Sequence, residues 1–172
     1  MIEQADRDQP RQSQTMPVVI VLDNLRSAFN VGNIFRLAES LRVRQIIGCG
    51  YTALPPHAKL AKTARGCDRL VSSRRLETSR AAAQEMKNGG YRLVAVETAV
   101  EATAFHGWQA EFPLALVFGN EALGIAPAIL AECDDIVRLP AYGQKNSINV
   151  ANCAAAVLYE VRRQWETTHD LT

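Results

Sequence analysis

Residues 139–152 read Leu139-Pro140-Ala141-Tyr142-Gly143-Gln144-Lys145-Asn146-Ser147-Ile148-Asn149-Val150-Ala151-Asn152. They follow a short apolar run at Ile136 to Leu139 and lead into Val150 to Trp165, where apolar side chains recur at helical spacing. Pro140 cannot donate to a strand ladder, and Gly143 permits backbone angles that other residues resist. The pattern therefore predicts a strand, a tight loop and the start of a helix.

Three short polar side chains, Ser147, Asn149 and Asn152, fall at the start of that predicted helix. Such side chains cap the free amides of a helix N-terminus, where a ligand also finds hydrogen-bond donors. Capping alone and ligand binding fit this pattern equally well, so other segments have to distinguish them.

The composition is that of a globular protein, with 48% apolar and 22% charged residues in a chain of 172. This length suits one domain with a real core. We expect a flexible polar tail at Met1–Pro17 and a single domain over residues 18–172. No apolar run approaches a membrane span, and Met1–Pro17 is too polar for a signal peptide, so we expect a cytoplasmic protein without a membrane partner.

The cysteines and histidines are scattered along the chain. They are Cys49, Cys67, Cys133, Cys153, His57, His106 and His169. No two of them stand at metal-ligand spacing, and there is no Cys-x-x-Cys pair. We therefore expect neither a metal site nor a disulfide framework.

Charge is unevenly distributed, although the net charge is only +1. Between Arg26 and Arg80 there are eleven basic and three acidic residues, or +8, and the rest of the chain carries −7. A basic region of this kind predicts contact with a nucleic acid, and the alternative is a solvated basic face.

Strands and helices alternate along the chain. Strands are expected at Val18–Leu22, Arg44–Gly48, Tyr91–Val96, Pro113–Phe118 and Asp135–Leu139, with a brief one at Leu70–Ser72. Helices are expected from Asn30 to about Leu41, from Pro55-Pro56-His57 to about Ala64, at Ser79–Asn88, Pro127–Glu132 and 150–165. This alternation predicts an α/β fold with a mostly parallel sheet flanked by helices.

Ligands of open parallel sheets bind beyond the carboxyl ends of the strands. Three segments are expected there: Asn30–Arg36, Gly119–Gly124 and Leu139–Asn152. Asn30 is the expected N-cap of its helix, and Arg36 is expected to face the same cleft. No Gly-x-Gly-x-x-Gly fingerprint and no Walker A loop is present, which opposes a nucleotide-dependent oxidoreductase.

These three segments resemble the signature motifs of the SPOUT RNA methyltransferases, in the SpoU/TrmH branch. The first is Asn30-Val31-Gly32-Asn33-Ile34-Phe35-Arg36, the second Phe118-Gly119-Asn120-Glu121-Ala122-Leu123-Gly124, and the third combines Leu139-Pro140 with Ser147-Ile148-Asn149-Val150. The resemblance covers roughly Val18 to Trp165. It implies an α/β knot whose C-terminal segment forms a trefoil knot around the cofactor pocket.

The resemblance also implies S-adenosylmethionine as cofactor, bound near Val96, Gly119, Leu139 and Ile148. It implies a homodimer, with the last helix supplying much of the interface. The partner would be RNA rather than DNA, and the methyl acceptor a ribose 2′-hydroxyl. The compact single-domain build favours tRNA over rRNA as the substrate.

The catalytic residues that the resemblance implies are Arg36, Asn30, Ser147, Asn149 and Glu121. Arg36 acts either as general base or as a cation that holds a phosphate and stabilises the developing alkoxide, and the permanent charge of arginine favours the second role. Asn30 orients Arg36 or the ribose, Ser147 and Asn149 shape the pocket, and Glu121 anchors the loops. The alternative function is a catalytically inactive knotted RNA-binding module.

Overall fold

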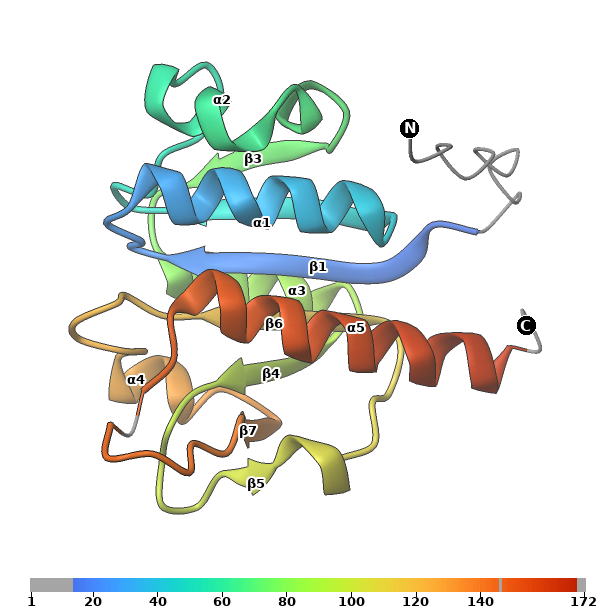
Figure 1. Ribbon diagram of the computed structural model, residues 1–172. Helices are drawn as coiled ribbons and strands as arrows, with labels where there is room; N and C mark the ends of the chain where they lie inside the picture. The colour runs from blue at the N-terminus through green and yellow to red at the C-terminus, as the bar shows by residue number, and fades with distance from the viewer. Residues whose placement is uncertain (1–13, 146, 170–172) are drawn as a thin grey trace, which may run out of the picture.

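The protein is built on a seven-stranded parallel sheet, as a computed structural model that describes residues 14–145 and 147–169 shows (Figure 1). The strand order is β3-β2-β1-β6-β4-β7-β5. The strands are β1 (Met16–Asp23), β2 (Val43–Cys49), β3 (Ser73–Leu76), β4 (Arg92–Val96), β5 (Thr103–Ala104), β6 (Leu114–Phe118) and β7 (Asp135–Arg138). All six strand pairings are parallel, which confirms the predicted α/β class.

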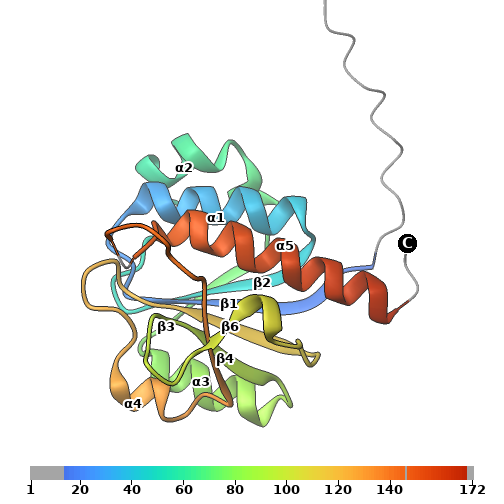
Figure 2. The same cartoon turned by 60° about the horizontal axis from the view of Figure 1, so that its bottom comes forward.

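Helices cover both faces of this sheet (Figure 2). They are α1 (Ala28–Ser40), α2 (Ala58–Ala64), α3 (Ser79–Asn88), α4 (Pro127–Leu130) and α5 (Val150–Thr168), with short 3-10 turns η1 (Cys67–Arg69) and η2 (Phe105–Gly107). Helices α1 and α5 lie on one face, α3 and α4 lie on the other, and α2 packs against α1. The result is a three-layer sandwich.

The central strand β1 is apolar on both faces because it is covered on both. Val18, Ile20 and Leu22 pack into the core beneath α1 and α5, whereas Val19 and Val21 pack into the core beneath α3 and α4. A strand buried on both faces reads as a continuous apolar run rather than an alternating one. This arrangement explains why the sequence pattern located β1.

Two predicted boundaries were wrong. The first strand begins at Met16 instead of Val18, because Met16 is fully buried and its amide donates to the Arg42 carbonyl. Helix α1 begins at Ala28 and its N-cap is Ser27, whose side chain accepts from the Asn30 amide, so Asn30 lies inside the helix. The predicted flexible tail, Met1–Pro17, lies outside the described residues as far as position 13, so its flexibility stays a prediction.

The predicted brief strand at Leu70–Ser72 was also misplaced. The strand is β3 at Ser73–Leu76, and Leu70 is 73% exposed. As an edge strand, β3 pairs only with β2, so it lacks the apolar run of a central strand. The local signal at Leu70 was therefore misleading.

Strand order creates a switch point between β1 and β6. From β1 the chain adds β2 and β3 on one side, and all later strands lie on the other side. In such sheets the loops on either side of the switch point separate and leave room for a ligand at the carboxyl ends. The predicted trefoil knot concerns the threading of the β7–α5 connection, which strand order does not trace, so the knot stays a prediction. In the described part of the chain no helix is long and apolar enough to cross a membrane.

Candidate active site

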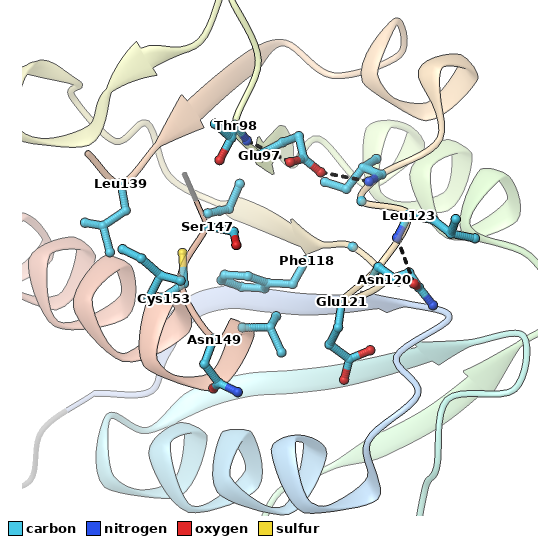
Figure 3. A pocket seen from close by; sticks show the side chains of 17 residues that line it. Glu97, Thr98, Phe118, Asn120, Glu121, Leu123, Leu139, Ser147, Asn149 and Cys153 are labelled. Carbon is cyan, nitrogen blue, oxygen red and sulfur yellow. Dashed lines mark hydrogen bonds between the residues drawn. The ribbon is translucent and has the colours of Figure 1, made fainter. Parts of the chain in front are cut away.

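A cavity of about 700 Å³ lies at the carboxyl ends of β6, β4 and β7. Its lining includes all four predicted cofactor residues, Val96, Gly119, Leu139 and Ile148. Figure 3 shows side chains from the ends of these strands and the start of α5 converging on it. The volume is in the usual range for a small-molecule site.

One wall of the cavity is apolar. Phe118 and Val96, at the ends of β6 and β4, are 1% and 8% exposed, and Cys153 of α5 lies beside them in the lining. Burial, reinforced by the nearby Glu97 carboxylate, raises the pKa of the Cys153 thiol to about 11. Cys153 is therefore neutral at physiological pH and forms part of the apolar wall instead of acting as a nucleophile.

The loop after β6 is built on close backbone approach. A Cβ on Gly119 would lie 2.5 Å from the Gly124 carbonyl carbon and 2.6 Å from the Ile125 amide nitrogen. Gly124 has φ +67°, and a Cβ there would lie 2.5 Å from Glu97 Oε2. Both positions require glycine, which explains their place in the motif.

Glu97, which the sequence analysis did not single out, fixes that loop from the neighbouring strand. Its Oε2 accepts from the Ile125 amide at 2.8 Å, and its Oε1 accepts from the Thr98 amide at 2.7 Å. Glu97 and Thr98 both line the cavity. The signal was present, because Glu97 directly follows Val96 and so lies at the same carboxyl edge as the predicted segments.

Asn120 is a second residue that the analysis did not assign to the site. It is 5% exposed, and its Nδ2 donates to the Asn24 carbonyl and to the Tyr51 hydroxyl, both at 2.7 Å. Its Oδ1 accepts from the amides of Ala122 and Leu123 at 2.9 and 3.0 Å. Asn120 thus ties the loop after β6 to the loops after β1 and β2.

Glu121 holds the loop before α1. Its carboxylate accepts from the Arg26 amide at 2.8 Å, the Ser27 amide at 3.1 Å and Asn30 Nδ2 at 3.0 Å. Partial burial alone would raise the pKa of Glu121, but these hydrogen bonds lower it below the usual range for glutamate. The carboxylate is charged at neutral pH and anchors the first motif to the second.

Asn149 completes the connection to the third motif. It is the N-cap of α5, accepting from the amides of Ala151 and Asn152 at 3.0 and 3.3 Å. Its Nδ2 donates to Asn30 Oδ1 at 3.2 Å. Asn149 therefore both caps α5 and contacts the first motif. Through these contacts Glu121, Asn30 and Asn149 form a continuous hydrogen-bonded chain that joins all three motifs.

Arg36, which was expected to face the same cleft as Asn30, is not among the residues that line this cavity. Six residues of helix place it about 9 Å along the axis from Asn30 and about 120° around it. Arg36 is exposed and is absent from the cavity lining. It lies near Cys67 of η1, where the pKa of the thiol is raised by burial and by Glu39 and lowered in part by Arg36.

Of the remaining predicted catalytic residues, Ser147, Asn149 and Glu121 line the cavity. Asn30 lies behind that lining, hydrogen-bonded to two of its members. Among the described residues no cluster of three His, Cys, Asp or Glu side chains could hold a metal ion. The site offers carboxylates, amides, backbone donors and an apolar wall.

A family model for the SpoU rRNA Methylase family matches residues 17–159, which contain all three motifs. The chain belongs to this family. A Staphylococcus haemolyticus protein named "Putative TrmH family tRNA/rRNA methyltransferase" is 31% identical over 166 residues. That alignment covers 94% of the chain and 66% of the relative, so the chain spans a little under two thirds of the relative's length.

Solved structures of the SpoU/TrmH family share the fold. The A. aeolicus TrmH/SpoU tRNA modifying enzyme is 26% identical with a TM-score of 0.81, over 92% of this chain and 80% of that one. The SpoU methyltransferase AviRb of Streptomyces viridochromogenes, solved with its cofactor AdoMet, is 25% identical with a TM-score of 0.78, over 95% of this chain and 66% of that one. The α/β fold of the chain is thus the fold of this family.

Proposed function

We propose that this protein transfers a methyl group from S-adenosylmethionine to a ribose 2′-hydroxyl of RNA, as a homodimer in the cytoplasm. The observation that supports it best is the hydrogen-bonded chain from Glu121 through Asn30 to Asn149 beside the cavity. It joins loops that are far apart in the sequence into one site, and family membership supplies the reaction class.

The cavity suits the proposed cofactor in size and in the chemistry of its lining. Apolar surface for an adenine ring comes from Val96, Phe118, Leu139 and Ile148. The backbone at Gly119, which also lines the cavity, would form hydrogen bonds with the edge of the adenine. When bound, S-adenosylmethionine supplies an electrophilic methyl group. The protein's contribution is to hold that group and to exclude water from it.

The polar residues would position the ribose. In-line transfer requires the 2′-oxygen to be held at near-attack distance, and positioning of this kind supplies a large share of catalysis. Ser147 and Asn149 lie at the cavity, and the Asn30 amide is oriented from both sides by Glu121 and Asn149. We assign these three residues to binding and orienting the ribose.

We assign Arg36 to holding a phosphate of the RNA. Its side chain is exposed and lies outside the cavity lining, and a guanidinium stays charged at all physiological pH values. A permanent cation at the surface suits a phosphate better than it suits proton abstraction. Arg36 would stabilise charge on the substrate from outside the cofactor cavity.

We favour tRNA over rRNA as substrate, and α5 as the main dimer contact. The A. aeolicus relative is named a tRNA modifying enzyme and aligns over most of its length.

Tyr159 of α5 is 58% exposed, which leaves a large apolar side chain available to a second copy. Analytical ultracentrifugation of the wild type and of Tyr159→Glu would test this dimer. An equal dimer fraction in the two proteins would refute the assignment of the interface to α5.

The proposed reaction is tested by incubating the protein with S-adenosylmethionine and unmodified tRNA or rRNA transcripts, followed by mass-spectrometric mapping of ribose methylation. We expect a 2′-O-methyl group on tRNA. Methylation of a base, or of rRNA alone, would refute the corresponding part of the proposal. Comparison of RNA from a strain lacking the protein would identify the nucleotide.

The second candidate is an RNA-binding module without transfer activity, and the observation that favours it is the position of Arg36 outside the cavity lining. Calorimetric titration with S-adenosylmethionine separates the two functions. Micromolar or tighter binding supports the enzyme, whereas RNA binding without cofactor binding supports the module.

A further inference from the structure

Tyr51 presents an exposed aromatic ring next to the candidate active site. It lies in the turn after β2, at the same carboxyl edge of the sheet as the cavity, and it is 61% exposed. Its hydroxyl oxygen accepts from Nδ2 of Asn120, a residue of the cavity lining, at 2.7 Å. The ring is therefore attached to the site through its polar end while much of its surface faces solvent.

The backbone on both sides of Tyr51 is fixed. Arg75 donates a hydrogen bond from Nη1 to the Gly50 carbonyl and another from Nη2 to the Thr52 carbonyl, the latter at 2.8 Å. Thr52 is fully buried; its hydroxyl donates to the Leu22 carbonyl and accepts from the Leu25 amide, both at 3.0 Å. The turn is thus tied to the loop between β1 and α1.

Close packing adds to this rigidity. Gly50 has φ +56°, and a Cβ there would lie 2.0 Å from Asn24 Oδ1. Asn24 itself has φ +53°, and its carbonyl accepts from Asn120. Two left-handed residues in contact hold the turn in one conformation. An exposed aromatic ring held in this way loses little entropy when a flat partner stacks on it.

Tyr51 belongs to the basic part of the sequence between Arg26 and Arg80. Arg26, Lys59, Lys62 and Arg65 are exposed and make no ion pair or side-chain hydrogen bond within residues 14–145 and 147–169. Arg26 directly precedes Ser27 of the loop held by Glu121, and the others lie on or next to α2, which packs against α1. Exposed cations that form no ion pair and an exposed aromatic ring are the features with which proteins bind unpaired nucleotides.

We propose that the Tyr51 ring stacks on an unpaired base of the RNA substrate and so sets the position of that RNA relative to the cofactor cavity. This inference rests on the proposed function for the identity of the reaction, but RNA binding itself can be measured without methyl transfer. Tyr51 is a positioning residue in this scheme. The Asn120 hydrogen bond couples its place to the loop that carries Glu121.

Two substitutions separate stacking from a structural role of the hydroxyl. Tyr51→Phe keeps the ring and removes the hydrogen bond to Asn120, whereas Tyr51→Leu keeps apolar bulk and removes the flat ring. A structural role predicts that both variants are equally impaired. Stacking predicts that only Tyr51→Leu is impaired.

The experiment measures the affinity of full-length wild type and both variants for one unmodified tRNA transcript, by fluorescence anisotropy at a fixed salt concentration. S-adenosylmethionine affinity is measured by calorimetry on the same samples. We expect Tyr51→Leu to bind the tRNA about 5- to 150-fold more weakly, the loss that corresponds to one base–aromatic stack. We expect Tyr51→Phe to stay within about threefold of wild type, and cofactor affinity to be unchanged in both.

Equal tRNA binding by wild type and Tyr51→Leu would overturn the inference, as would equal losses in both variants or a parallel loss of cofactor binding. These outcomes differ from failure of the proposed function. Wild type that binds tRNA without methylating a ribose refutes the reaction, while the comparison of Tyr51→Leu with Tyr51→Phe still decides the role of the ring.

Discussion

Replacing Glu121 by glutamine tests the central link of the candidate site. The carboxylate accepts three hydrogen bonds, one at Oε2 from the Arg26 amide and two at Oε1 from the Ser27 amide and Asn30 Nδ2. Glutamine has nearly the same shape but only one acceptor oxygen. In its best orientation the Oε1 contacts survive without charge, and an amide NH₂ faces the Arg26 N–H.

The magnitude follows from those contacts. Glu121→Gln loses one charge-assisted hydrogen bond, a class that contributes about 1.5–3 kcal/mol, and weakens two others. Glu121 is exposed, so water compensates in part, and we expect the free energy of unfolding to fall by about 1–2 kcal/mol. For a domain of this size that corresponds to a melting temperature lower by about 2–8 °C.

The assay is urea unfolding at several pH values, with Glu101→Gln as control. Glu101 is exposed and forms no hydrogen bond or ion pair with any residue in the described part of the chain. Because the pKa of Glu121 is lowered in the folded state, its stabilisation is complete above the ordinary glutamate pKa of about 4.3 and is lost as pH falls through the folded value. The difference between wild type and Glu121→Gln should therefore be full at pH 7 and shrink below about pH 4. Equal stability of Glu121→Gln and Glu101→Gln at pH 7 would show that the three hydrogen bonds do not hold the loop.

Three further outcomes are expected. Gly119→Ala should lower the free energy of unfolding by about 1–3 kcal/mol and weaken S-adenosylmethionine binding, because its Cβ would lie 2.5 Å from backbone; Gly107→Ala, with open space at its Cβ, should change neither in melting and calorimetric measurements. Arg36→Ala should reduce methyl transfer about 10²–10³-fold with cofactor affinity retained, and unchanged turnover would remove Arg36 from the mechanism. Arg92→Met should lower the free energy of unfolding, measured by urea denaturation, by about 1–2 kcal/mol, since Arg92 pairs with Asp135 at 2.7 and 3.0 Å and joins β4 to β7. A change below about 0.5 kcal/mol, the usual range for surface substitutions, would show that the pair does not stabilise the fold.

The four residues that were expected to bind the cofactor lie together in the structure, and their role in binding stays a prediction. Val96, Gly119, Leu139 and Ile148 all line one cavity, and Ser147, Asn149 and Glu121 join them there. The resemblance of the three motifs to those of the SpoU/TrmH family implied these positions, and the rule that parallel strands end at a common edge placed the motifs together. Glu97 was within reach of the same rule, because it directly follows Val96.

Other residues could not have been assigned from the chain alone. Asn120 acquires its role from Asn24 and Tyr51, which are 96 and 69 residues away. The direction of Arg36 depends on which side of α1 faces α5 and which faces η1. Such relations arise when β1 and β6 become neighbours, and no local pattern encodes that adjacency.

By itself the sequence determined the order of the helices and of the buried strands β1, β2, β4, β6 and β7, since burial on one or two faces leaves a periodic or continuous apolar pattern in the chain; the short strands β3 and β5 lack such a pattern. It also determined the three motifs, whose glycines and short polar residues are local requirements of the backbone. Only the tertiary structure decided that Glu121 holds the loop before α1, that Tyr51 is fixed beside the cavity and that Arg36 lies outside it. These features depend on hydrogen bonds and helix orientations between segments that are distant in the sequence. Strand order brings those segments together, so their contacts contribute free energy only in the folded protein.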